Sequence, residues 1–242
     1  MSFLSVDLHT HILPGIDDGC SNAEEAVKML RMEYEQGVET VFLTPHFHGQ
    51  DMYPDQFLEA RQASYDLMLT EISEQDSAPR LVLGAEVHYC PGMNAWEQLP
   101  KLTLGSSNYI LIEMPFTPWT ETILDELERI YNERGLIPVL AHVERYFLPL
   151  RKKKLLERLS KTPFFLQFNA SFLTERRTRA FALKLFKESK VHFIGSDCHS
   201  AIWRAPNVGC ARDILLSHTN EAERDNFSKL EKAILLETTR LE

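Results

Sequence analysis

The chain has 242 residues and is 44% hydrophobic, which suits one large α/β domain or two small ones. Its formal net charge of −9 disfavours nonspecific binding to nucleic acid. No apolar run approaches the roughly 20 residues that cross a bilayer, and the first residues lack the basic and apolar segments of a signal peptide. Because the four cysteines form no C-x-x-C pair, which fits a reducing compartment, we expect a cytoplasmic protein without membrane insertion.

Short apolar runs and helical patterns alternate along the chain. The first run ends in His9 and His11 and is followed by a Pro-Gly turn and the acidic stretch Asp17-Asp18-Gly19. Further runs predict strands over 38–44, 80–85, 109–112, 137–141, 164–168 and 191–195. Helical patterns cover about 22–35, 55–73, 120–134, 152–160 and 175–189, and much of the remainder after 206.

This alternation predicts a parallel sheet with crossover helices, and therefore an α/β fold. The strands lack strict polar alternation, which indicates that both of their faces are buried. Seven strand-helix units suit a closed barrel better than an open sheet. The chain contains no linker, repeat or low-complexity segment, so we predict a single domain over residues 1–242.

Histidines and carboxylates recur at the carboxyl ends of six of these strands. In a parallel barrel all such ends lie on one rim, and residues two apart in a strand share a face. The strand-end residues are His9, His11, His46, Glu86, Glu113, His142, Asp197 and His199, and one aspartate of the acidic turn after the first strand, counted as Asp18, brings the set to nine. Five imidazoles and four carboxylates are too many for one tetrahedral zinc. We therefore expect two or three divalent ions that share carboxylates, Mn²⁺ first, with Fe or Zn²⁺ as alternatives.

Two arginines follow these candidate ligands closely. Arg145 lies three residues after His142, and Arg204 lies five residues after His199. Guanidinium groups match phosphate oxygens in pairs, although surface ion pairs are the simpler interpretation. Metal clusters of this type supply a hydroxide at neutral pH and hold a phosphoryl oxygen. The resulting hypothesis is in-line attack of this hydroxide on phosphorus, with metals and arginines holding the oxygens.

Six motifs in order carry a resemblance to a known family. They are D-L-H-T-H-I-L-P-G-I-D-D-G at 7–19, L-T-P-H at 43–46, G-A-E at 84–86, L-I-E at 111–113, A-H-V-E-R-Y at 141–146 and G-S-D-C-H at 195–199. The sequence resembles the polymerase and histidinol phosphatase (PHP) family, most closely the bacterial metal-dependent protein-tyrosine phosphatases of capsule and exopolysaccharide operons.

The resemblance implies a distorted (β/α)7 barrel of the TIM-like PHP fold with a three-metal centre. It implies that the nine residues above are the ligands, with Asp18 rather than its neighbour Asp17, and that Arg145 and Arg204 bind phosphate. The implied partner is a tyrosine autokinase that controls polysaccharide export and whose phosphotyrosines are removed.

Other interpretations remain open from the residues alone. Cys198 and Arg204 fit the C-x5-R spacing of cysteine-dependent phosphatases, but Ile202 and Trp203 lie between them and no glycine does. The same centre could act on a small phosphomonoester such as histidinol phosphate, or on a nucleic-acid phosphodiester, which the acidic charge disfavours. A non-catalytic regulatory scaffold stabilised by metal is a third interpretation. Aromatic segments at 47–54, 89–107 and 116–119 are expected at the rim, as are His48 and His88.

Overall fold

The computed structural model describes residues 3–73, 77–147 and 153–238, in which parallel strands and helices alternate. The strands are β1 (Val6–Thr10), β2 (Thr40–Leu43), β3 (His46–Phe47), β4 (Arg80–Leu83), β5 (Glu86–His88), β6 (Tyr109–Glu113), β7 (Ile137–Leu140), β8 (Phe165–Asn169) and β9 (Phe193–Gly195). The helices are α1 (Ala23–Glu35), α2 (Pro54–Glu71), α3 (Glu121–Arg134), α4 (Glu144–Phe147), α5 (Lys153–Leu159), α6 (Ala170–Thr174), α7 (Arg179–Lys187), α8 (Val208–His218) and α9 (Glu221–Thr238), with 3-10 turns η1 (Met93–Ala95) and η2 (Leu99–Leu102).

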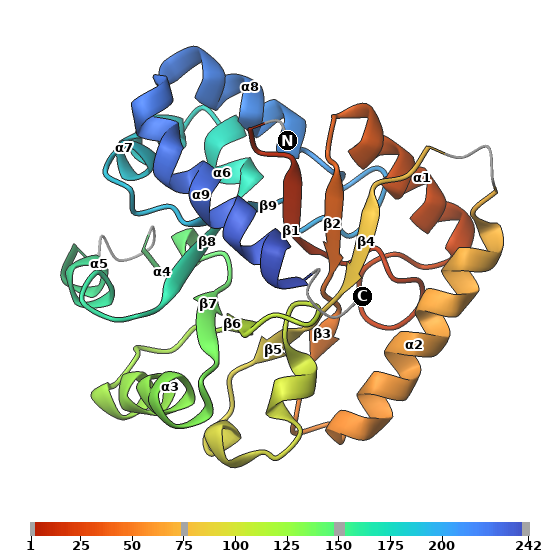
Figure 1. The fold of residues 1–242 in the computed structure, drawn as a ribbon, viewed down its shortest axis with the longest axis horizontal. Coiled ribbons are helices and arrows are strands. Elements are labelled where there is room, and N and C mark those ends of the chain that lie inside the picture. Colours follow the sequence, from red (N-terminus) through yellow and green to blue (C-terminus); the bar gives the residue numbers. More distant parts are fainter. Residues whose placement is uncertain (1–2, 74–76, 148–152, 239–242) are drawn as a thin grey trace.

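The strands form a ring of seven units. One sheet has the order β1-β2-β4 and the other β3-β5-β6-β7-β8-β9, because a short additional strand, β3 or β5, follows each of the strands predicted over 38–44 and 80–85. The ring closes between β9 and β1, where Asp197 N donates to His9 O at 2.8 Å and His11 N donates to Cys198 O at 2.9 Å. Helices α1, α2, α3 and α7 lie outside the strands (Figure 1). The predicted barrel is therefore confirmed.

The predicted helices are found with small shifts. Asn22 caps α1, since its side chain accepts from Glu25 N at 2.9 Å. The helix expected over 175–189 begins only at Arg179, because the Thr178 hydroxyl donates to Phe172 O at 2.8 Å and turns the preceding segment back onto α6. The predicted helix start at residue 152 lies outside the described residues. None of the described helices combines the length and the apolar character of a membrane span.

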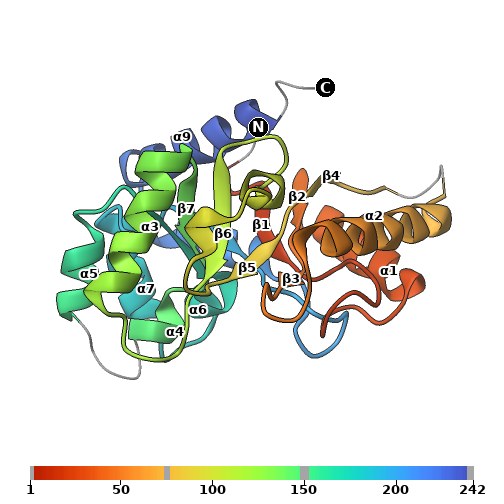
Figure 2. The ribbon, with the colours of Figure 1, turned by 90° about the horizontal axis from the view of Figure 1, so that it is seen from below.

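Helix α9 covers the end of the barrel at which the strands begin. Its Ile234 and Leu235 belong to one apolar cluster with residues of β1, β2, β4, β6, β7 and β9. Two backbone groups that precede strands donate to this helix: Leu4 N to Glu231 Oε2 at 3.0 Å and Asn108 N to a carboxylate of α9. Figure 2 shows α9 and α4 on opposite sides of the strands. The carboxyl ends of the strands therefore face away from α9.

A bulge in β1 connects the apolar interior to the polar rim. Between Asp7 and Thr10, β1 advances by three residues while its partner β2 advances by two. The additional residue breaks the strict alternation of faces. As a result Leu8 lies in the interior apolar cluster while the next residue, His9, reaches Glu86. In a regular strand these two neighbours would point to opposite faces.

The buried carboxyl of Glu231 predicts a pH dependence of stability. Burial raises the pKa of Glu231 to about 8 from 4.5, so its contribution to stability is complete below pH 4.5 and is lost as the pH rises through about 8. Glu231→Gln keeps an acceptor for Leu4 N without a charge to bury. The difference in unfolding free energy between this variant and wild type should shift in favour of the variant as the pH rises from 6 to 8. The shift should be at most about 1.4 kcal/mol per pH unit. Denaturant titrations measure this, and parallel pH curves would contradict it.

Candidate metal centre

The structure brings the nine predicted side chains together at the carboxyl ends of the strands, and Glu86 lies at their centre. Its Oε2 is 3.0 Å from His9 Nε2, 3.0 Å from His46 Nδ1 and 3.3 Å from His11 Nε2. Its Oε1 is 2.9 Å from His142 Nε2. Although burial favours the protonated acid, the surrounding imidazoles, His9 foremost, hold the pKa of Glu86 well below its usual range. This carboxylate therefore remains ionised in a fully buried position.

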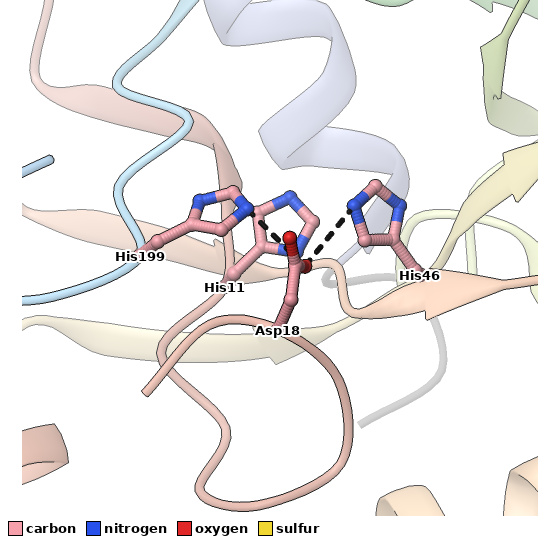
Figure 3. A group of neighbouring side chains, drawn as sticks. All are labelled: His11, Asp18, His46 and His199. Carbon is pink, nitrogen blue, oxygen red and sulfur yellow. Dashed lines mark ion pairs between the residues drawn. The ribbon is translucent and has the colours of Figure 1, made fainter. Parts of the chain in front are cut away.

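A second group lies nearer the surface. Asp18 Oδ1 is 3.5 Å from both His46 Nε2 and His199 Nε2 (Figure 3). One ligand atom from each of these residues and from His11 lies within 4.8 Å of the others. Asp18 is exposed and comes from the acidic loop after β1, whereas His46 begins β3 and His199 follows β9. Three chain segments, the one after β1, β3 and the one after β9, therefore supply one group of nitrogen and oxygen donors.

Glu113 and His142 complete the cluster on the side of β6 and β7. Glu113 Oε1 is 3.4 Å from His142 Nε2, and its Oε2 is 3.0 Å from His88 Nδ1. Despite partial burial, these imidazole contacts lower the pKa of Glu113 to about 2. His142 and Asp197 both have positive φ, 31° and 55°, a strained backbone that is concentrated at functional sites.

Gln167 on β8 is a site residue that the sequence analysis did not identify. Its Oε1 accepts from His142 N at 2.7 Å and lies 3.2 Å from His9 Nδ1. Since a backbone N–H can only donate, Oε1 is an acceptor, and His9 must carry its proton on Nδ1. The Nε2 lone pair of His9 then faces the cluster. Polar Gln167 and Asn169 are two apart in an apolar strand, and this pattern is the signal that could have identified them.

The structure distinguishes the roles of the two neighbouring aspartates. Asp17 Oδ2 accepts from His11 Nδ1 at 2.7 Å and from His46 N at 2.9 Å. Burial opposes ionisation, but the His11 contact lowers the pKa of Asp17 to about 2. Asp17 thus orients His11 with Nε2 toward the cluster, as carboxylates orient metal-binding histidines in other proteins. Asp18 is the aspartate whose carboxylate faces the cluster.

Both predicted arginines meet on Asp197. Arg204 Nη2 donates to Asp197 Oδ2 at 2.6 Å, and Arg145 Nη2 donates to the same oxygen. Asn169 Nδ2 donates to it at 2.7 Å. The other oxygen, Oδ1, is 3.4 Å from His11 Nε2. Asp197 therefore joins the imidazole cluster to the arginines, which are partly exposed and could bind an anion.

The donor set fits divalent cations. Glu86 Oε2 and His46 Nδ1 are buried and lie 3.0 Å apart, but neither makes a hydrogen bond of acceptable geometry, so both remain available to bind a metal ion. His199 Nδ1 donates to Asp197 O at 3.0 Å, which leaves its Nε2 free to bind a metal, as for His9 and His11. Nitrogen and carboxylate donors without thiolate suit Mn²⁺, Fe or Zn²⁺.

A cavity of about 810 Å³ opens beside the cluster. Asp18, His46 and Glu113 line one side of it, and the other side is largely apolar. The predicted aromatic segment 47–54 contributes Phe47 and Met52 to this lining. Described residues of 89–107 do not line it; Trp96 of that segment instead packs against Phe47, with ring centroids 5.9 Å apart.

Cys198 is placed unfavourably for nucleophilic catalysis. Its thiol is buried, and burial together with Glu33 and Asp7 raises its pKa well above the usual range, whereas a nucleophilic cysteine needs a stabilised thiolate. We expect Cys198→Ser to retain most of the wild-type kcat, while loss of a true nucleophile costs on the order of 10⁶. Steady-state rates with a phosphotyrosyl peptide test this. Complete loss with the metal content unchanged would favour the cysteine mechanism.

Known proteins share this chain's sequence and fold. The family described as capsular polysaccharide synthesis, CpsB/CapC, matches residues 5–235. The chain is 30% identical over 204 residues to tyrosine-protein phosphatase YwqE of Bacillus subtilis (strain 168), covering 81% of this chain and 77% of that one. It is 29% identical over 222 residues to tyrosine-protein phosphatase CpsB of Streptococcus pneumoniae, covering 87% and 89%.

A solved structure matches nearly the whole fold. It comes from the crystal structures of YwqE from Bacillus subtilis and CpsB from Streptococcus pneumoniae, described as unique metal-dependent tyrosine phosphatases. The TM-score is 0.81 at 25% identity, covering 97% of this chain and 95% of that one. These matches confirm the fold and the family resemblance that the six motifs indicated.

Proposed function

Because this chain belongs to the capsular polysaccharide synthesis family CpsB/CapC, we propose that it is a metal-dependent phosphatase that removes phosphate from tyrosine side chains. One observation carries the proposal: Glu86 lies among four imidazoles next to an aspartate that two arginines contact. The relatives YwqE and CpsB bear the name tyrosine-protein phosphatase, and their solved structures are described as metal-dependent.

The nine clustered residues are the proposed ligands of two or three divalent ions, Mn²⁺ first, with Fe or Zn²⁺ as alternatives. Such ions supply a hydroxide at neutral pH and neutralise phosphoryl charge. Gln167 and Asp17 contact the Nδ1 atoms of His9 and His11, which leaves the Nε2 atoms facing the cluster, where they would hold the ions. Removing partners of this kind from a metal-binding histidine weakens metal affinity by about 10–100-fold in other proteins.

Arg145 and Arg204 are the proposed phosphate-binding residues. Each offers several N–H donors in a planar arrangement that matches phosphate oxygens. Asp197 already holds both side chains at the site, so little conformational entropy remains to be lost when substrate binds. The leaving group is the tyrosyl oxygen, and no protein nucleophile is needed.

The proposed partner is a phosphotyrosine-containing autokinase of polysaccharide export, which the family's role in capsule synthesis supports. We place the reaction in the cytoplasm, because all four cysteines are free thiols, as expected in a reducing compartment.

The test compares rates on a phosphotyrosyl peptide and on histidinol phosphate, before and after chelation, with elemental analysis of the purified protein. We expect bound divalent metal, faster turnover of the peptide and loss of turnover after demetallation. Preference for histidinol phosphate would favour a small-molecule phosphoesterase instead. Metal-loaded protein inert toward both would favour a regulatory scaffold, and full activity without metal would exclude the metal mechanism.

A further inference from the structure

The loop after β9 exposes two large apolar side chains at its tip. Trp203 is 90% exposed and Ile202 is 73% exposed, and among the described residues no large apolar side chain is more exposed than Trp203. A tryptophan fully in water loses the burial that stabilises aromatic side chains elsewhere. Adjacent exposed apolar side chains beside a functional site make that surface a candidate for recognition of a ligand.

The loop is held in a defined conformation. The Ser200 hydroxyl oxygen accepts from Trp203 N at 2.9 Å and from Ile202 N at 3.2 Å. His199 N donates to Arg204 O at 2.9 Å and closes the base of the loop. The backbone of Trp203 is therefore fixed between a proposed metal ligand, His199, and a proposed phosphate-binding arginine, Arg204, so the loop itself loses little conformational entropy when a ligand binds.

Trp203 shares a cavity with both arginines. This cavity has a volume of about 420 Å³, and Arg145, Arg204 and Trp203 line it together with Asn169 and Phe172. It is distinct from the larger cavity beside Asp18. A cavity lined by two guanidinium groups and an indole suits a ligand with an anionic group attached to a flat apolar ring.

We propose that Trp203 is a specificity-determining residue whose indole packs against the aryl ring of a phosphotyrosyl side chain while Arg204 contacts its phosphate. The inference rests on the proposed phosphatase activity and adds a reason why an aryl phosphate is favoured over an alkyl phosphate. An alkyl phosphate would contact the arginines but leave the indole exposed.

The test compares Trp203→Ala and Trp203→Phe with Ile202→Ala, a control in the same loop. Because aromatic pairs contribute modestly, Trp203→Ala should raise KM for a phosphotyrosyl peptide about three- to tenfold, and Trp203→Phe should raise it much less. Inorganic phosphate has no ring, so its inhibition constant should be the same in all four proteins. Ile202→Ala should leave both constants near wild type. A non-hydrolysable phosphotyrosine analogue should quench tryptophan emission in wild type but not in Trp203→Phe.

The outcomes separate this inference from the proposed function. An unchanged peptide KM in Trp203→Ala would overturn the role of Trp203 while wild-type hydrolysis of the peptide still supported the phosphatase. An equal rise in peptide KM and in the phosphate inhibition constant would assign the effect to displaced Arg204 and would also overturn it. Wild-type protein inert toward phosphotyrosine would remove the proposed function itself.

Discussion

Replacing Glu86 with glutamine is expected to remove most of the bound metal and to lower kcat by about a thousandfold or more. The substitution keeps the shape of the side chain but removes the charge that four imidazole nitrogens approach within 3.3 Å. A divalent ion supplies several kcal/mol of charge stabilisation, and each 1.4 kcal/mol or so corresponds to a tenfold rate change. Elemental analysis and rates on a phosphotyrosyl peptide measure the two effects on one preparation.

The matched control is Glu231→Gln, which makes the same side-chain substitution at another buried glutamate on the opposite side of the barrel, one whose raised pKa leaves it largely uncharged at neutral pH. It should keep wild-type metal content and kcat. Circular dichroism of both variants establishes that they are folded. If Glu86→Gln binds and turns over like wild type, the cluster is not the catalytic centre.

Loss of either arginine is expected to lower kcat/KM for the peptide by about 10²–10³, the range found when one preorganised donor to a developing charge is removed. Arg145→Ala and Arg204→Ala should behave alike, because both guanidinium groups contact the same oxygen of Asp197. Since they share this partner, the double variant should lose less than the product of the two single losses. Metal content should change little in either variant.

Arg158→Ala is the appropriate control. The Arg158 side chain is 35% exposed, against 34% for Arg145, and it pairs with carboxylates of α3 rather than with the cluster. Its removal should leave kcat/KM at the wild-type value. Arginine variants that retain full activity would show that Arg145 and Arg204 serve only to neutralise Asp197.

Most of the fold follows from patterns in the sequence, and the exceptions have local causes. The seven apolar runs form strands because a parallel strand that is buried on both faces has apolar residues at successive positions. Helices α4 and α6, with four and five residues, are too short to express a helical period. The bulge at Leu8 and His9 depends on pairing with β2, which no single strand encodes.

That the proposed ligands would lie together was predictable, and how they are organised was less so. Ligand candidates at strand ends required only that the strands be parallel. The assignment of Asp17 as a support for His11 depends on the path of the loop after β1. The role of Gln167 depends on which strand lies beside β7. Arg145 and Arg204 can contact the same carboxylate only when three loops are placed correctly relative to one another.

The position of α9 has a consequence for the order in which the chain is made. The barrel interior around Val6 and Leu8 is sealed by a helix synthesised more than 200 residues later. While the ribosome is still translating, the amino end of the barrel therefore exposes its hydrophobic residues to water and to other nascent chains. A premature stop codon before Glu221 would make this exposure permanent, and such a product should be captured by chaperones or precipitate even though every proposed metal ligand is present in it.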